Sequence, residues 1–144
     1  MAQQVATGPS PRFEGPAGGP RPPLRRSHQR DIYGALDLGT NNCRLLIARP
    51  SDGGFTVLDA FSRIVRLGEG LSTSGKLTQG SMDRAVEALG VCADKLRRRH
   101  VTLARSVATE ACRRAVNGRE FVARVHRETG IALEIIAPQE EARP

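Results

Sequence analysis

The feature that most constrains this chain is a short polar turn between two apolar segments near residue 40. Residues 32–38 (IYGALDL) are mostly apolar, residues 39–42 (GTNN) are polar, and residues 43–48 (CRLLIA) are again mostly apolar. Gly39 can adopt a positive φ without steric cost, and asparagine tolerates left-handed conformations better than most residues. The segment therefore predicts two strands joined by a tight turn, with Asp37 near the end of the first strand.

A turn of this kind can direct backbone N–H groups and short polar side chains into one concavity, which is how a peptide chain cradles phosphate. The candidate phosphate-binding residues are Gly39, Thr40, Asn41, Asn42 and Cys43. Asp37 would face the same concavity, where its carboxylate could hold a hydrated cation or position a water molecule. Taken alone, the turn is equally compatible with an ordinary β-hairpin.

Length and composition indicate one folded domain preceded by a basic tail. The chain has 144 residues, long enough to bury a single hydrophobic core. Residues 1–30 are rich in proline and glycine and contain five arginines and one glutamate, which is +4 of the chain's net +7. Such a composition buries too little apolar surface to offset the entropy of ordering. We predict a disordered tail over 1–30 and a folded lobe over 31–144.

The basic tail leaves two roles open. Basic arms can contact nucleic acid nonspecifically, and a tail that only aids solubility is the alternative. The tail lacks the continuous apolar stretch of a secretory signal, and no segment of the chain reaches the length of a membrane span. We therefore expect no membrane partner.

The three cysteines, Cys43, Cys92 and Cys112, are widely spaced and contain no C-x-x-C pair. This spacing predicts neither a disulfide framework nor a zinc site, and it fits a protein of the reducing cytoplasm. Cys92 falls on the apolar face of a predicted helix, so we expect it in the core.

Periodicity predicts alternating strands and helices after the first hairpin. Apolar and polar residues alternate over 55–61, which predicts a third strand, and an irregular glycine-containing link with a short strand over 64–67 follows. A helix then begins at Thr78 or Ser81 and ends at the cationic run 97–100. Further elements are a strand over 101–108, a short helix over 109–115, a helix from Asn117, as N-cap, to Gly130, and a strand over 131–136.

Four separated motifs in this chain resemble one known family. They are residues 37–47 (DLGTNNCRLLI), 66–71 (RLGEGL, with GKLT at 75–78), 108–118 (ATEACRRAVNG) and 139–143 (QEEAR). In this order they resemble the amino-terminal half of the exopolyphosphatase / guanosine pentaphosphate phosphohydrolase (Ppx/GppA) family. The resemblance covers about residues 32–143. It implies an α/β fold, the ribonuclease H-like first lobe of the actin, sugar-kinase and chaperone ATPase superfamily, with a five-stranded mixed sheet and flanking helices.

The resemblance also implies an activity and two further site residues. Members release terminal phosphate from inorganic polyphosphate or guanosine pentaphosphate with Mg²⁺, and the sequence does not decide between these substrates. Arg113 matches the substrate-phosphate arginine, for which a two-pronged guanidinium contact is suited, although an exposed helix arginine is the alternative. Glu141 matches the family's general base, the second acid of its E-E-A-R motif. Nearby phosphate oxygens would raise the proton affinity of such a carboxylate toward what a base at neutral pH needs. If the family resemblance is set aside, the adjacent Glu140 and Glu141 indicate the solvent-exposed first turn of a helix.

The chain departs from the family pattern after Arg143. The family continues into a second lobe that opens with a D-I-G-G-G-S motif, whereas this sequence stops at Pro144. We therefore expect a lobe truncated before the second lobe, inactive or nearly so alone, with an exposed sheet face that favours self-association. The alternatives are a noncatalytic polyanion-binding module or remnant, and a sugar-kinase-like or actin-like ATPase lobe.

Overall fold

The computed structural model describes residues 31–137. The tail predicted over 1–30 and the segment 138–144, which contains Glu141, lie outside the described residues.

The described chain forms one five-stranded mixed sheet. The strands are β1 (Tyr33–Leu38), β2 (Asn42–Ser51), β3 (Gly54–Ile64), β4 (Leu103–Ala108) and β5 (Glu134–Ile135). Their order in the sheet is β3-β2-β1-β4-β5. β1 pairs antiparallel with β2, β2 antiparallel with β3, and β4 runs parallel to both β1 and β5. The predicted mixed sheet of five strands is confirmed.

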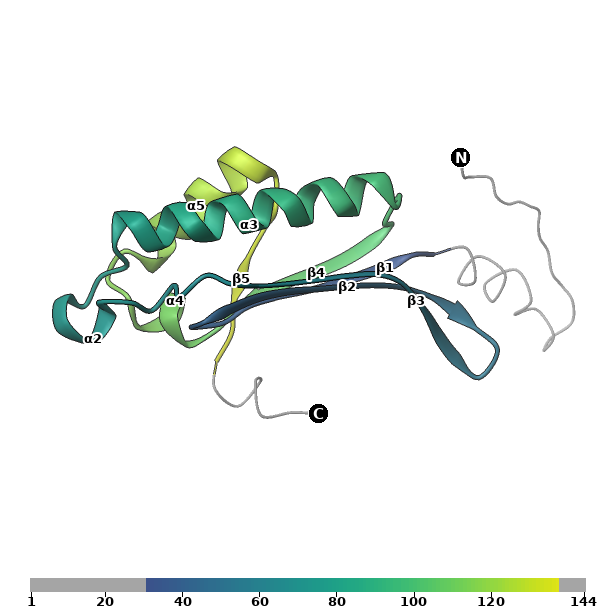
Figure 1. The fold of residues 1–144 in the computed structure, drawn as a ribbon, viewed down its shortest axis with the longest axis horizontal. Coiled ribbons are helices and arrows are strands. Elements are labelled where there is room, and N and C mark those ends of the chain that lie inside the picture. Colours follow the sequence, from purple (N-terminus) through teal and green to yellow (C-terminus); the bar gives the residue numbers. More distant parts are fainter. Residues whose placement is uncertain (1–30, 138–144) are drawn as a thin grey trace, which may run out of the picture.

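The helices leave one face of this sheet open. They are α2 (Leu71–Ser74), α3 (Gln79–Arg98), α4 (Glu110–Arg114) and α5 (Gly118–Thr129). Figure 1 shows α3 and α5 side by side over one face, and no helix of residues 31–137 covers the opposite face. None of these helices is long and apolar enough to cross a membrane.

The alternation of side chains along the strands explains this one-sided arrangement. Leu36 and Leu38 of β1 and every second residue of β2 from Cys43 to Ile47 are buried. The alternate residues of β2, Arg44 and Leu46, are exposed on the opposite face. The buried set packs against the apolar face of α3, which includes Leu89 and Cys92. The core position predicted for Cys92 is confirmed.

Capping interactions fix both ends of α3. The Thr78 side chain accepts a hydrogen bond from the Ser81 N–H at 3.1 Å, so the helix begins after Thr78. At the other end the N–H groups of His100 and Val101 donate to the carbonyls of Arg97 and Leu96, and His100 has a φ of 56°. This is a Schellman ending with histidine in the left-handed position that glycine usually occupies.

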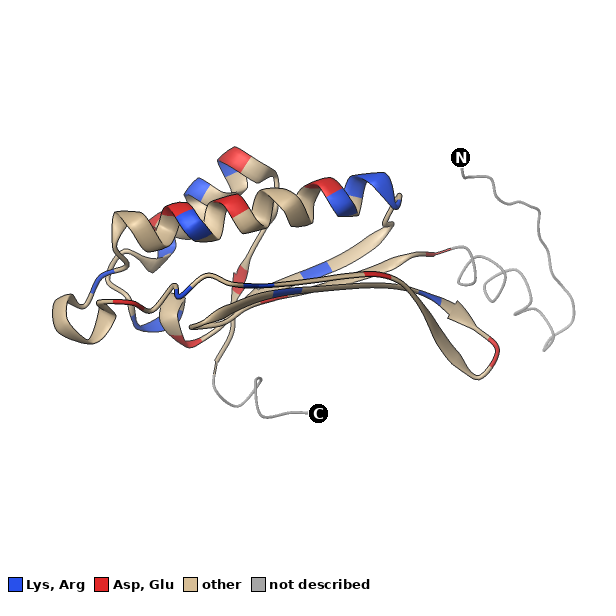
Figure 2. Ribbon diagram, viewed as in Figure 1, with Lys and Arg blue, Asp and Glu red and all other residues tan. Residues whose placement is uncertain are grey.

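The cationic run at the end of α3 has a structural role, as the sequence indicated. Arg97 and Arg98 form ion pairs with Asp94, and Arg99 and Lys95 form ion pairs with Asp59 of β3. Figure 2 shows these cations gathered at the carboxyl end of the helix, where they also interact favourably with its dipole.

Three local predictions differ from the structure. β3 continues to Ile64, so the short separate strand expected over 64–67 is absent there, and residues 71–74 form the helix α2. β5 has two residues instead of six. Asn117 lies at the N-cap of α5 but does not cap it: its side chain accepts from the Leu77 N–H at 2.9 Å and donates to the Leu77 carbonyl at 3.1 Å.

Two helical glycines provide a matched test of this packing. A Cβ on Gly118 would lie 2.0 Å from the Cys112 carbonyl oxygen, whereas a Cβ on Gly90 would meet nothing within 4 Å. We expect Gly118→Ala to lower the free energy of unfolding by about 3 kcal/mol or more, because backbone blocks the new methyl group. Gly90→Ala should raise it by about 1 kcal/mol. Urea denaturation measures both, and equal effects would contradict the packing of α4 against α5.

Candidate functional site

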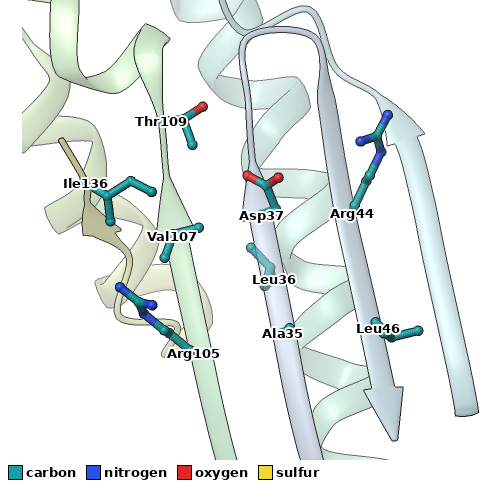
Figure 3. A pocket seen from close by; sticks show the side chains of 9 residues that line it. All are labelled: Ala35, Leu36, Asp37, Arg44, Leu46, Arg105, Val107, Thr109 and Ile136. Carbon is teal, nitrogen blue, oxygen red and sulfur yellow. The ribbon is translucent and has the colours of Figure 1, made fainter. Parts of the chain in front are cut away.

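The open face of the sheet contains a cavity of about 540 Å³ (Figure 3). It lies over β1, β2 and β4 near the carboxyl ends of β1 and β4. The lining residues are Ala35, Leu36, Asp37, Arg44, Leu46, Arg105, Val107, Thr109 and Ile136. Ligands of open α/β sheets bind at the carboxyl ends of parallel strands, so the position of this cavity is the one that the fold favours.

Asp37 and Thr109 lie at the ends of neighbouring parallel strands. Asp37 is the fifth residue of β1, and Thr109 directly follows β4. In Figure 3 both side chains extend toward the cavity. The N–H of Thr109 donates to the Leu38 carbonyl at 3.1 Å, which fixes Thr109 beside the end of β1. The pairing of β1 with β4 therefore brings together a carboxylate and a hydroxyl group that are far apart in sequence.

Arg44 adds a positive charge to the same face. It is directly opposite Asp37 in the antiparallel register of β1 and β2, and it forms no ion pair with another described residue. Arg105 of β4 lines the other side of the cavity and forms an ion pair with Glu134 at 3.4 Å. The cavity thus has an acid flanked by two guanidinium groups, a charge arrangement suited to a phosphorylated ligand.

The turn between β1 and β2 lies next to this cavity. None of residues 39–42 has a positive φ, so the turn does not use the left-handed conformation that is open to Gly39. The Gly39 N–H donates to the Asn42 carbonyl at 2.9 Å, and a Cβ on Gly39 would lie 3.7 Å from the Thr109 hydroxyl. The N–H groups of Thr40 and Asn41 have no acceptor among the described residues, so these two remain available to a ligand.

Hydrogen bonds from a distant segment hold the turn in this conformation. The Asn41 carbonyl accepts from the N–H groups of Val65 and Arg66, at 2.7 and 3.0 Å. The Thr40 carbonyl accepts from the Gly68 N–H at 3.0 Å. Both carbonyls are thus bound by backbone from outside the hairpin. Arg66, in the segment that supplies these donors, has a positive φ of 49°.

Arg84 of α3 connects this clamping segment to the core. Its Nε donates to the Val65 carbonyl at 2.8 Å, and its Nη2 donates to the Arg66 carbonyl at 3.1 Å and to Glu69 at 2.6 Å. The motif at residues 66–71 is therefore a support for the turn. Its residues hold the turn in place and do not line the cavity.

Cys43 follows the turn but faces the core. Its side chain is fully buried, and its Sγ lies 3.8 Å from that of Cys92 in α3. Of the groups of Cys43, only the main chain is near the turn. The phosphate-binding role predicted for Cys43 therefore stays a prediction, and it concerns the backbone of this residue alone.

Arg113 lies in α4 beside the end of β5. Its Nη1 donates to the Ile136 carbonyl at 2.6 Å, so the guanidinium is next to a residue that lines the cavity. The neighbouring Arg114 is exposed and forms an ion pair with Glu110 within α4, as an ordinary helix arginine does. The structure therefore separates the two arginines of the motif: one is directed toward the sheet end, and one toward solvent.

The donor set for a metal ion is small. Residues 31–137 contain no cluster of three His, Cys, Asp or Glu side chains that could hold a metal. Among residues 31–137, Asp37 is the one carboxylate that lines the cavity. Mg²⁺ commonly binds through one or two carboxylates, several waters and substrate phosphates, so Asp37 fits a hydrated Mg²⁺ that arrives with its substrate.

Sequence reasoning missed three residues of this site: Arg44, Arg105 and Thr109. A local signal existed for Arg44, because alternation from buried Cys43 and Leu45 places it on the face opposite the core. For Arg105 and Thr109 the decisive information is the parallel pairing of β4 with β1, which joins segments about 70 residues apart.

Comparisons with known proteins agree with this geometry. The model of the Ppx/GppA phosphatase family matches residues 46–144. The chain belongs to this family. A Ppx/GppA family member from Aquifex aeolicus is 32% identical, with a TM-score of 0.74 over 77% of this chain and 36% of that protein. An exopolyphosphatase from Cytophaga hutchinsonii is 30% identical, with a TM-score of 0.74 over 78% of this chain and 36% of that protein.

The family-model match begins at residue 46, after β1 and the turn. The structural similarities confirm the predicted ribonuclease H-like lobe of the Ppx/GppA family as the fold. The chain spans about a third of the length of these relatives.

The clamp on the turn can be tested by a double-mutant cycle. A Cβ on Gly68 would lie 2.5 Å from Thr40 Cγ2, while the next nearest atoms are 3.8 Å away. We expect Gly68→Ala to cost about 2 kcal/mol of unfolding free energy through this overpacking. In a Thr40→Ser background, which lacks Cγ2, the same substitution should cost less than half as much. Additive effects in urea denaturation would contradict the contact.

Proposed function

We propose that this chain is the phosphate-binding lobe of a phosphohydrolase that releases terminal phosphate from inorganic polyphosphate or guanosine pentaphosphate. The observation that carries the proposal is the position of Asp37 and Thr109 at the ends of two parallel strands, beside a turn with available N–H groups and opposite Arg44. Membership of the Ppx/GppA phosphatase family supports it.

Each group has a role that phosphoryl transfer requires. The N–H groups of Thr40 and Asn41 and the hydroxyl of Thr109 would bind the terminal phosphoryl oxygens. Arg44 and Arg113 would neutralise their charge with two-pronged contacts. Mg²⁺, when bound through water to Asp37, would supply further neutralisation of the phosphate oxygens. Glu141, outside the described residues, would take a proton from the attacking water.

The proposed activity requires a partner surface. The cavity lies on the open face of the sheet, whereas phosphoryl transfer depends on preorganised groups from which bulk water is excluded. We propose that a second lobe closes the cavity, as a further part of the polypeptide, a separate chain or a second copy of this one. Long polyphosphate chains would then lie in the cleft between the two lobes.

Glu141→Ala tests the catalytic assignment. We expect it to abolish phosphate release from long-chain polyphosphate with Mg²⁺, in whichever assembly of this chain proves active, because no other group is assigned to activate the water. Polyphosphate binding should persist, since the phosphate-contacting groups are unchanged. Phosphate release is measured colorimetrically. Full turnover by the variant would exclude Glu141 as the base.

Arg44→Ala tests the binding site in the chain alone. Loss of a charge-assisted contact should weaken polyphosphate binding about tenfold or more. Arg49→Ala is the matched control, because Arg49 is an exposed residue of β2 that does not line the cavity. Titration of fluorescent polyphosphate measures both. Equal effects would indicate nonspecific charge attraction.

Deletion of residues 1–30 separates the lobe from the tail. Unchanged polyphosphate affinity after the deletion would support the site on the sheet. Loss of binding would favour the noncatalytic polyanion-binding module, with the basic tail as the binding element.

A further inference from the structure

A second constellation of reactive groups lies directly behind the turn, on the face of the sheet that the proposed function does not use. Cys43 begins the apolar part of β2, one residue after Asn42, and Cys92 lies on the inner face of α3. Their Sγ atoms are 3.8 Å apart and share a hydrogen bond, and both side chains are 0% exposed. Two thiols separated by 49 positions in sequence are thus held face to face in the core.

The surroundings make the two thiols unequal. The pKa of the Cys92 thiol lies below its ordinary value because of the hydrogen bond with Cys43, and the positive charges of Arg63 and Lys95 act in the same direction. The pKa of the Cys43 thiol is raised by the same hydrogen bond and by burial. The hydrogen bond and the nearby positive charges therefore favour the thiolate at Cys92, and the thiolate is the nucleophilic form.

We infer that Cys43 and Cys92 form an oxidative modification site, at which a peroxide converts the two thiols into a reversible disulfide between β2 and α3. The sulfurs must approach from 3.8 Å to the bonding distance of about 2.05 Å, a closure of less than 2 Å that side-chain rotation and small shifts of the helix supply.

The reaction balances with hydrogen peroxide as the oxidant. The Cys92 thiolate attacks one peroxide oxygen, the O–O bond breaks, and the other oxygen leaves as water after gaining a proton. The Cys43 sulfur then attacks the resulting Cys92 sulfenic acid, the S–S bond forms, and the S–O bond breaks to release a second water. Both sulfurs are oxidised and one peroxide is reduced. Because both thiols are buried, the reaction proceeds through local opening of the core and is slower than for an exposed thiol.

Cys112 is an internal control. It is buried to a similar degree, with 2% exposure, and burial raises its pKa to about 12. No sulfur of the described residues is paired with it. Burial alone would protect all three cysteines equally from oxidation. A prearranged pair predicts instead that only the thiols of Cys43 and Cys92 are lost.

The experiment treats the purified full chain with hydrogen peroxide, removes the oxidant with catalase, and alkylates the remaining thiols in denaturant. Peptide mapping without reduction should show one intramolecular disulfide between Cys43 and Cys92, with Cys112 alkylated. The number of free thiols per chain should fall from three to one and return to three after treatment with dithiothreitol.

Two variants sharpen the test. After peroxide treatment the Cys112→Ser variant should lose both of its remaining thiols, and the Cys92→Ser variant should keep both of its remaining thiols. Three retained thiols, a disulfide that includes Cys112, or an intermolecular product would overturn the inference.

A second measurement does not depend on any variant that could fold poorly. The disulfide closes a loop of about 50 residues, which constrains the unfolded chain. The oxidised protein should therefore unfold at a higher temperature than the reduced protein, by several degrees, and dithiothreitol should reverse the shift. An unchanged or lower midpoint would show that the native core cannot accommodate the bond. Neither measurement involves phosphate, so failure of the proposed function would leave this inference untouched.

Discussion

The site depends on hydrogen bonds that reach the β1–β2 turn from outside the hairpin. The carbonyls of Thr40 and Asn41 accept from the backbone of residues 65–68, and Arg84 of α3 holds that segment through two of its carbonyls. The carbonyls of the turn are thus bound by the protein, while the N–H groups of Thr40 and Asn41 have no acceptor among the described residues. Through Arg84, α3 therefore helps to fix the backbone of the turn, although none of its residues lines the cavity.

The second constraint is that the helices of the described chain cover one face of the sheet only. The alternation of side chains sends Leu36, Leu38 and Cys43 toward α3 and sends Asp37 and Arg44 to the open face. The core and the proposed site therefore lie on opposite sides of the same two strands. Residues next to one another in sequence serve stability and binding separately, which explains how Cys43 can belong to a thiol pair while Arg44 lines the cavity.

Much of the fold could be predicted because its signals are local. Periodicity located the strands and α3, and Thr78 was one of the two residues predicted for the start of α3. Gly130, in the left-handed conformation, marked the end of α5. The errors arose where distant contacts decide the local structure. Asn117 looks like a helix cap from its neighbours, yet its amide pairs with Leu77, 40 residues away. The four-residue α2 lies between two glycines with positive φ and has too few residues for a periodic pattern.

The sequence by itself determined the order of the five strands and of α3, α4 and α5, the family resemblance, and the positions of Asp37 and Arg113 at the ends of secondary-structure elements. These properties follow from the residues immediately along the chain, whose periodicity and turn chemistry are readable in one dimension. Only the tertiary structure decided that Thr109 and Arg105 join Asp37, that residues 65–68 hold the turn, and that Cys43 meets Cys92. Each of these contacts joins segments far apart in sequence, and strand register and helix docking, which fix such contacts, depend on the packing of the whole core.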